Sequence, residues 1–311
     1  MAAELTAPPE PVAAARAHTE RAFYKVGYTS HIFGLMDRLY PYVGREIALG
    51  LGRAIAGTYA QTHPGVVEVV RRNIELIAPS QATTETAHRV FTEYGATIAD
   101  YIAIGNMTPA DAADLCVERS GLEHLEEARR RGTGAILVTG HLGFFEFGSL
   151  LLRQYGFDVS IVTLSEPTEA LTRWRADFRR RWGTETIEIG RDAFSSLEVT
   201  RAVGNGRYTA MLVDRPFGPR ACEIPIGNGR ALFSEAPAMI AWISGCPIIP
   251  VAITRSGNDH YRMVAHPCIW SDPTLSRSEN IQTMTRRSAE ALITEFERAP
   301  EQWYHFIPIG R

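Results

Sequence analysis

The spacing of hydrophobic residues along the chain changes near residue 121. Upstream, apolar side chains are dense and recur at helical intervals over 18–104, including the segments 45–62, 66–77 and 84–104. Downstream, short apolar runs alternate with amphipathic segments, which is the pattern of strands followed by helices. We therefore predict an α/β fold, in which a central, mostly parallel sheet is flanked by helices and preceded by an N-terminal helical region.

The predicted elements of the second half follow from this alternation. Strands are expected at 135–138, 159–163, 186–189, 208–213, 248–254 and 261–265. Helices are expected at 122–130, 144–155, 169–181, 193–203, 236–244 and 281–298. In the first half, Pro41 is expected to break the first helical segment.

The domain organisation follows from composition as well as pattern. Proline and alanine dominate residues 1–15, which have few large apolar side chains, so we expect a disordered tail there. The remainder, 16–311, is expected to be a single domain. It would consist of the helical region at 16–120 and an α/β core at 121–311.

No apolar run reaches the ~20 residues of a membrane-spanning helix, and no signal peptide is visible. We therefore expect a cytoplasmic protein. The N-terminal helices have two open interpretations, because an apolar stripe commonly faces a core but can also lie on a membrane surface. Tyr24, Tyr28, Tyr40 and Tyr42 keep the second interpretation open, since tyrosine is enriched at membrane interfaces.

Charge and motif content exclude several functional classes. The formal net charge is -3, which argues against a general nucleic-acid binder, and no nucleic-acid partner is expected. The four cysteines have no C-x-x-C spacing, and no histidine pair has the H-x-x-x-H spacing of a metal site. Serine-hydrolase, P-loop and dinucleotide-binding motifs are also missing. We expect neither a metal nor a bound cofactor.

A histidine and an acid follow the predicted strand 135–138. His141 comes directly after Gly140, and Glu146 follows in the predicted helix 144–155. Because His141 precedes that helix, Glu146 could fold back to the imidazole, fixing its tautomer and leaving the other nitrogen to accept a proton. The alternative is that His141 caps the helix and Glu146 complements its dipole. Spacing alone leaves both interpretations open.

Asp214 also directly follows a predicted strand, 208–213. Ligands of open α/β sheets bind at the carboxyl ends of the strands, so Asp214 is expected at the same edge as His141. It would be a second orienting acid, a substrate ligand, or a turn residue before Arg215. Arginines crowd the segment 173–181, where the choice lies between a solvated face and bidentate binding of phosphate on a carrier, coenzyme or lipid headgroup.

The segment 139–146, which contains His141 and Glu146, resembles the H-x4-D/E block of the lysophospholipid acyltransferase superfamily. Within it, the sequence resembles the lipid A biosynthesis late acyltransferases (lauroyl/myristoyl type) and is similar to phosphatidylinositol mannoside acyltransferase. Further blocks of the family occur in family order. The blocks are 70–76, 139–146, 214–219 with 224–231 and 234–237, 246–251 and 300–303.

This resemblance implies transfer of a fatty acyl chain from an acyl thioester to a hydroxyl of a lipid or glycolipid. The thioester would be carried by acyl carrier protein or coenzyme A, and no covalent enzyme intermediate is needed. His141 would be the general base, oriented by Glu146, and Asp214 would make a second polar contact to His141 or the acceptor.

The resemblance also implies substrate-binding residues. Arg179 falls where relatives place an arginine, with Glu166 as its candidate partner, and Arg215 is a further substrate-binding candidate. Phe144 and Phe145 replace the Asn-Trp of the typical family block and would form a wall of an apolar acyl groove. Relatives usually begin with a membrane-spanning helix. Since none is visible here, a peripheral enzyme on the inner face of the cell membrane is expected.

Three alternative functions remain open. The same residues could hydrolyse an acyl thioester, with water as the acceptor. They could acylate a lysophospholipid or another glycerolipid. A non-catalytic lipid-binding protein is the third alternative. Free fatty acid without acylated acceptor would identify the hydrolase, and unchanged function of a His141 variant would identify the binding protein.

Overall fold

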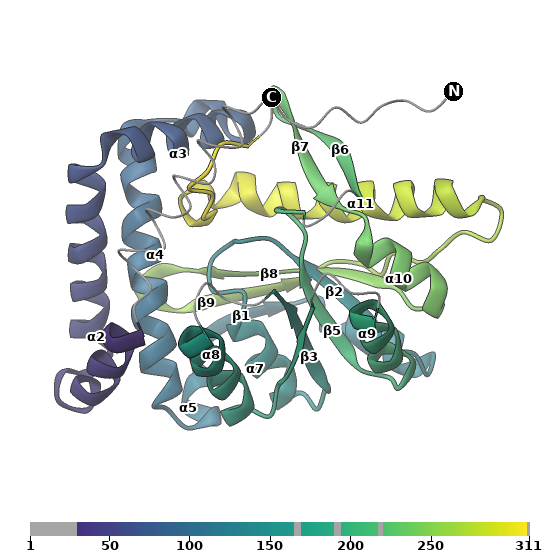
Figure 1. The fold of residues 1–311 in the computed structure, drawn as a ribbon, viewed down its shortest axis with the longest axis horizontal. Coiled ribbons are helices and arrows are strands. Elements are labelled where there is room, and N and C mark those ends of the chain that lie inside the picture. The colour runs from purple at the N-terminus through teal and green to yellow at the C-terminus, as the bar shows by residue number, and fades with distance from the viewer. Residues whose placement is uncertain (1–29, 165–168, 190–193, 217–219, 310–311) are drawn as a thin grey trace.

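The computed structural model describes residues 30–164, 169–189, 194–216 and 220–309. A seven-stranded sheet lies between two layers of helices, with the N-terminal helices standing at one end (Figure 1). The predicted α/β fold with a mostly parallel sheet and an N-terminal helical region is confirmed. The expected tail at 1–15 lies outside the described residues.

The N-terminal region consists of α2 (Ser30–Thr62), α3 (Pro64–Ile77) and α4 (Thr84–Gly105). Helix α2 continues through Pro41, so the break predicted there is wrong. The backbone departs from helical geometry at Gly44 instead (φ 71°, ψ 171°). The positive φ falls on Gly44 because glycine has no Cβ to clash in that conformation.

Close packing fastens α2 to α4. A Cβ on Gly52 would lie 2.4 Å from the carbonyl oxygen of Gly95, so only glycine permits this approach. Arg45 of α2 donates from Nε to Oδ1 of the buried Asp100 at 2.7 Å, and Arg255 donates to Oδ2 of the same carboxylate at 2.7 Å. The N-terminal helices therefore pack on the core. Across the described ranges, no helix combines the length and hydrophobicity needed to span a membrane.

The strands cover most of the predicted positions. They are β1 (Cys116–Ser120), β2 (Ala135–Thr139), β3 (Val159–Thr163), β4 (Glu185–Glu188), β5 (Tyr208–Leu212), β6 (Ala221–Ile226), β7 (Gly229–Ser234), β8 (Ile248–Arg255) and β9 (Tyr261–Ala265). The main sheet has the order β1-β9-β8-β2-β5-β3-β4. Strands β8, β2, β5, β3 and β4 are parallel, whereas β9 is antiparallel to β8 and parallel to β1.

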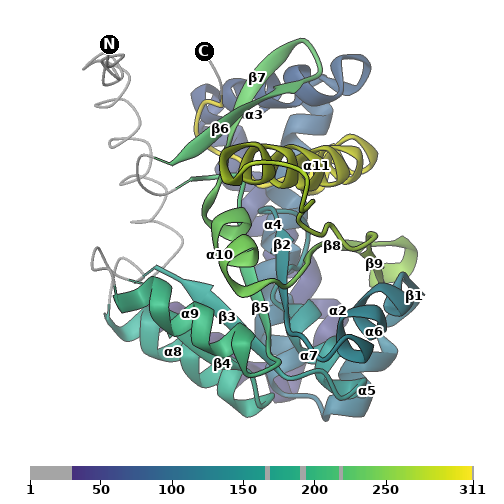
Figure 2. The same ribbon diagram turned by 90° about the vertical axis from the view of Figure 1, so that its right-hand side faces the viewer.

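Helices and short turns make up the other elements. They are η1 (Pro79–Gln81), α5 (Pro109–Asp114), α6 (Leu122–Arg130), α7 (Phe147–Gln154), α8 (Glu169–Arg181), α9 (Phe194–Gly204), α10 (Ala236–Ser244), η2 (Gly257–Asp259), α11 (Arg277–Arg298) and η3 (Pro300–Gln302). Successive side chains of β2 point to opposite faces of the sheet, and a separate hydrophobic core covers each face. Leu137 packs with α6 and α7, and Val138 packs with α10 and α11. Figures 1 and 2 show α11 and α7 on opposite sides of the sheet.

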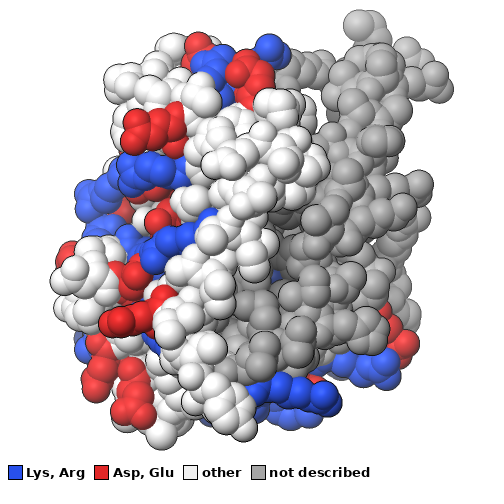
Figure 3. All heavy atoms as spheres, turned by 90° about the vertical axis from the view of Figure 1, so that its left-hand side faces the viewer, with Lys and Arg blue, Asp and Glu red and all other residues white. Residues whose placement is uncertain are grey.

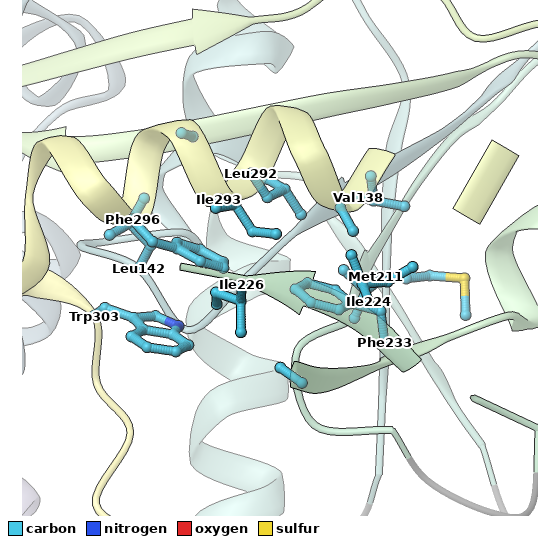
Figure 4. Packing of buried hydrophobic residues seen from close by; sticks show 14 of the residues in the cluster. Val138, Leu142, Met211, Ile224, Ile226, Phe233, Leu292, Ile293, Phe296 and Trp303 are labelled. Atoms are coloured by element: carbon cyan, nitrogen blue, oxygen red, sulfur yellow. The ribbon is translucent and has the colours of Figure 1, made fainter. Parts of the chain in front are cut away.

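Strand β1 and the β6–β7 hairpin were not predicted. Strand β1 lies at the sheet edge, and most of its side chains are exposed, so it carries no apolar run that a pattern could detect. In β6 the buried Ile224 and Ile226 alternate with exposed residues. The hairpin packs beside α11, where Phe233 and Ile224 join a cluster that includes Phe296 and Trp303 (Figure 4).

The pairing of β2 with β5 positions the site. Thr139 lies opposite Leu212 at the carboxyl ends of these adjacent parallel strands. The backbone N–H of Val213 extends the pairing by donating to the carbonyl of Thr139 at 3.0 Å. Residues that follow the two strands therefore emerge side by side at the edge where α/β sheets bind ligands.

Candidate active site

His141 and Asp214 meet at this edge. The imidazole Nδ1 of His141 lies 2.7 Å from Oδ1 of Asp214, and the backbone N–H of His141 donates to Oδ2 at 2.8 Å. Asp214 is buried, whereas the His141 side chain is 21% exposed. Among the described residues, Nε2 of this partly exposed side chain has no hydrogen-bond partner.

Tight backbone packing fixes the loop that carries His141. Gly143 has φ +54°, and a Cβ there would lie 2.1 Å from the carbonyl oxygen of Ile253. The loop also pairs with the C-terminal segment: Gly143 donates to the carbonyl of Gln302 at 2.9 Å, and Tyr304 donates to that of His141 at 2.8 Å. The histidine backbone is therefore held on both sides, which favours a single imidazole position.

Two aromatic side chains of the C-terminal segment complete the surroundings of Asp214. The indole Nε1 of Trp303 donates to Oδ2 at 3.1 Å, and Nε2 of His305 lies 3.4 Å from the same oxygen. Trp303 stacks on Phe296 of α11 with ring centroids 4.9 Å apart, which fixes the indole (Figure 4). Oδ2 of Asp214 thus faces several hydrogen-bond donors, whereas Oδ1 contacts the imidazole of His141.

These contacts set the charges of the pair. Burial alone would raise the pKa of Asp214, but the facing imidazoles of His141 and His305 hold it well below its usual value. Burial, assisted by the positive charge of Arg215, lowers the pKa of His141 despite Asp214. At neutral pH the pair is a carboxylate and a neutral imidazole that donates from Nδ1, so Nε2 presents the lone pair of a base.

Glu146 does not orient His141, contrary to the expectation. Its carboxylate accepts two hydrogen bonds from Arg179, from Nη2 to Oε1 at 2.7 Å and from Nε to Oε2 at 3.2 Å. The two residues are described throughout, and no hydrogen bond joins Glu146 to His141. The physical reason is the position of the helix: α7 begins at Phe147 rather than at residue 144, so Glu146 is directed towards α8.

The Glu146 carboxylate is a buried ion-pair centre. Burial would raise its pKa, but Arg179 and Arg175 together lower it below the usual value. The guanidinium of Arg175 lies 3.7 Å from Oε1. Arg179 is itself buried and bonds Glu146, and it also lines the neighbouring pocket, so its predicted substrate-binding role stays a prediction. Glu166, its expected partner, lies outside the described residues.

The two phenylalanines of the motif have different environments. Phe144 is fully buried and packs among Tyr101, Phe147 and Tyr261, so its predicted place in a groove wall is wrong. Phe145 lines a pocket and contacts His141, with the two rings edge to face at 5.9 Å. Phe145, and not Phe144, therefore lies between His141 and the apolar lining of the pocket.

The pocket lies between the sheet and helices α7 and α8. Its walls are mainly apolar side chains of β2, β3, β5 and β8, with Glu146, Arg175 and Arg179 on one side. In the central strand β5, Ala210 and Leu212 keep partial exposure, which shows that this face of the sheet is not fully covered. An apolar pocket with a few polar groups is the usual form of a small-molecule site.

Arg215 follows Asp214 and contributes positive charge near both imidazoles. It donates from Nη2 to the carbonyl of Tyr304, and its Nε is buried without a hydrogen-bond partner among the described residues. The predicted substrate-binding role of Arg215 stays a prediction.

His141, Asp214 and His305 also lie close enough to be considered as metal ligands, with candidate atoms within 4.8 Å of one another. Both carboxylate oxygens of Asp214 already accept hydrogen bonds, and the arginine next in sequence adds positive charge. Metal ligands need free lone pairs and a site that favours a cation. The donor set therefore fits proton transfer better than metal binding.

Sequence reasoning missed Trp303 and His305 as site residues. The segment 300–303 contributed to the family resemblance, but no role was given to its tryptophan. A pattern search could have flagged Trp303 through that block. His305 had no signal, because its approach to Asp214 depends on the pairing of the C-terminal segment with the His141 loop.

The fold and site define an α/β protein with a histidine–carboxylate pair beside an apolar pocket. Residues 24–308 match the family model described as bacterial lipid A biosynthesis acyltransferase, so the chain belongs to that family. The suspected family is confirmed.

Curated relatives agree with this assignment. The chain is 22% identical over 190 residues to phosphatidylinositol mannoside acyltransferase from Mycobacterium tuberculosis strains H37Rv and CDC 1551. The match covers 60% of this chain and 58% of each relative, so the chain spans less than two thirds of their length.

Proposed function

We propose that this protein is an O-acyltransferase that moves a fatty acyl chain from an acyl thioester to a hydroxyl of a lipid or glycolipid. The observation that carries the proposal is the hydrogen-bonded pair of His141 and Asp214 beside the apolar pocket. Family membership supports the reaction class. Three features of the site support the mechanism: a histidine suited to act as a base, a carboxylate suited to stabilise its protonated form, and an apolar pocket suited to an acyl chain.

In this proposal His141 acts as general base. The acceptor hydroxyl transfers its proton to Nε2 as its oxygen attacks the thioester carbonyl carbon. Nδ1 donates to Asp214 throughout, so the imidazolium that forms is stabilised by a carboxylate 2.7 Å away. When the carbon–sulfur bond breaks, Nε2 returns the proton to the departing thiolate. Atoms and charges balance without a covalent enzyme intermediate.

The negative charge of the tetrahedral intermediate also needs a counter-charge. Arg215 is the candidate, because it adjoins Asp214 and has a buried Nε without a hydrogen-bond partner among the described residues. A preorganised donor aimed at developing charge is worth roughly 3–4 kcal/mol of transition-state stabilisation. This role would make Arg215 a substrate-binding residue.

The acyl chain would occupy the pocket between the sheet and α7. Its walls follow one face of adjacent strands, including Leu137 of β2, Ile161 of β3 and Ala210 of β5. Phe145 lies at the end nearest His141. Each buried CH2 contributes about 0.8 kcal/mol, so the pocket would bind long chains well. The small side chain of Ala210 leaves room beside the central strand.

The donor and acceptor are proposed by chemical class. Acyl carrier protein and coenzyme A both deliver the chain as a thioester, and the exposed Arg173 and Arg180 of α8 suit their phosphates. The relatives' name points to a mannosylated phosphatidylinositol as one acceptor to test. No cofactor is required for the proposed steps.

Helix α2 supports contact with a membrane surface. Ile47, Leu51 and Ile55 recur every four residues and are 57%, 51% and 67% exposed, which places them on one helix face. Figure 3 shows this end of the molecule, where a band of uncharged surface runs beside clusters of both charges. An exposed apolar stripe on a helix suits insertion into the interfacial region of a bilayer.

The direct experiment supplies palmitoyl-coenzyme A and a phosphatidylinositol mannoside to the purified protein and follows products by mass spectrometry. The proposal expects acylated glycolipid from the native protein and none from His141→Ala, with the fold confirmed by circular dichroism. Free palmitate without acylated glycolipid would instead indicate a thioester hydrolase. Unchanged transfer by His141→Ala would overturn the proposal.

A further inference from the structure

His305 is a buried titratable group for which the proposed chemistry has no use so far. Its side chain is 4% exposed, and neither ring nitrogen makes a well-formed hydrogen bond to a described residue. Nε2 nevertheless lies 3.4 Å from Oδ2 of Asp214. A buried polar group without a partner is destabilising and calls for an explanation.

Residues of the same chain hold the backbone and the ring of His305 in place. The side-chain amide of Asn73 in α3 donates to the carbonyls of His305 and Ile307, at 2.8 Å each. The imidazole also packs against the indole of Trp303, with ring centroids 4.8 Å apart. The orientation towards Asp214 is therefore built into the C-terminal segment.

Burial and the charged groups around the site keep His305 neutral. Burial, followed by the charge of Arg215, lowers the pKa of His305 to about 3, although Asp214 opposes the shift. His141, which faces the same carboxylate from the strand edge, lowers the pKa of His305 as well. A neutral imidazole whose Nε2 faces a carboxylate is stable only with the proton on Nε2, because a lone pair there would be repelled.

We propose that His305 is a positioning residue that donates from Nε2 to Oδ2 of Asp214 and so limits how strongly Asp214 holds the proton on His141. This inference rests on the proposed function, in which His141 and Asp214 carry the proton transfer. The present 3.4 Å separation is compatible with that role, since hydrogen bonds of catalytic groups are often long without substrate and tighten when it binds.

The sign of the effect follows from the electrostatics. A donor on Oδ2 withdraws negative charge from the carboxylate, so the carboxylate stabilises the imidazolium of His141 less. Removing that donor concentrates charge on Asp214 and raises the pKa of His141. The base would then be protonated over a wider pH range. His305 thus helps to keep His141 neutral and ready to accept a proton.

The test is an NMR titration of the intact protein labelled with 15N at histidine, which reads the pKa of His141 without any substrate. His305→Phe removes the donor and keeps an aromatic ring, whereas His305→Gln keeps an N–H donor. We expect His141 to titrate about one pH unit higher in His305→Phe, a tenfold change in its acid constant. In His305→Gln it should titrate within a few tenths of a unit of the native protein.

Two additions keep the test decisive. If His305→Phe does not fold, as judged by circular dichroism, His305→Leu supplies a smaller apolar replacement with the same expected shift. Identical His141 titrations in the native protein and the folded apolar variant would overturn the inference. Its failure differs from failure of the proposed function, because the latter appears as retained acyl transfer in His141→Ala, whatever the titration shows.

Discussion

Asp214 bonds His141 twice, through the imidazole Nδ1 at 2.7 Å and through the backbone N–H at 2.8 Å. The carboxylate thereby fixes both the ring and the loop that carries it. A two-point contact of this kind leaves one imidazole tautomer, with Nε2 available to a substrate. Asp214, rather than the acid of the H-x4-E block, is the orienting group in this structure.

The pH profile of acyl transfer should reflect the burial of His141. Since burial and Arg215 lower its pKa below the ordinary 6.5, the base stays neutral to lower pH. We expect kcat/KM to be flat near neutrality and to fall only below the ordinary imidazole value of 6.5 as His141 becomes protonated. Initial rates in a constant-ionic-strength buffer series would measure this. An acid limb centred at or above pH 7 would contradict the assignment.

Replacing Glu146 should affect folding more than chemistry. Glu146→Gln leaves the guanidinium of Arg179 buried without its charge partner, which typically costs about 3–5 kcal/mol. Thermal melts followed by circular dichroism would measure the loss. Glu68→Gln is the matched control, since Glu68 pairs with Arg71 on the exposed face of α3 and its loss should change the melting temperature little.

The ion pair of Glu146 and Arg179 makes the free energy of unfolding depend on pH. The pKa of Glu146 is lower in the folded protein than its ordinary 4.5. Its contribution is therefore fully present above that ordinary value and is lost as pH falls through the folded-state pKa. If the native protein and Glu146→Gln lost stability equally between neutral pH and pH 3, this contribution would be absent.

Chain-length preference should respond to Ala210. Ala210→Leu adds bulk to the central strand where the pocket passes, so long acyl chains should lose affinity relative to short ones. Displacing two methylene groups corresponds to about 1.6 kcal/mol, or roughly tenfold in kcat/KM. Competition between acyl-coenzyme A donors of different lengths would measure the ratio. Ala210→Ser, which changes volume little, is the control, and an unchanged preference in Ala210→Leu would place the chain elsewhere.

Membrane contact through α2 makes a separate prediction. The double substitution Ile47→Ser and Ile55→Ser removes two exposed apolar side chains from one face, and it should weaken binding to lipid vesicles at least tenfold. Vesicle sedimentation would measure binding. Ile243→Ser of α10, which is 56% exposed, is the matched control. Equal vesicle binding by the double variant and this control would contradict the proposed surface.

The hydrophobic pattern predicted most strands of the main sheet, because a parallel strand that is buried on both faces is a continuous run of apolar residues. The runs ending before His141 and Asp214 became adjacent strands β2 and β5, which explains why both side chains reach one edge. The edge strand β1 escaped prediction because its side chains are mostly exposed.

The site was harder to predict than the framework. Asp214 orients His141 in place of Glu146 because of where α7 begins and because Glu146 pairs with Arg179. Arg179 lies 33 residues further along the chain than Glu146. Local spacing carries no information on such a distant ion pair. The approach of Trp303 and His305 to Asp214 depends on pairing between segments even further apart.

The turnover of Asp214→Asn tests the central claim most directly. An amide of the same shape can donate where the carboxylate accepts, so it favours the wrong imidazole tautomer and cannot stabilise the imidazolium. Acyl transfer from palmitoyl-coenzyme A should fall by on the order of 10³-fold or more, with the folded fraction unchanged. Near-native turnover in Asp214→Asn, together with loss of turnover in folded Glu146→Gln, would contradict this account.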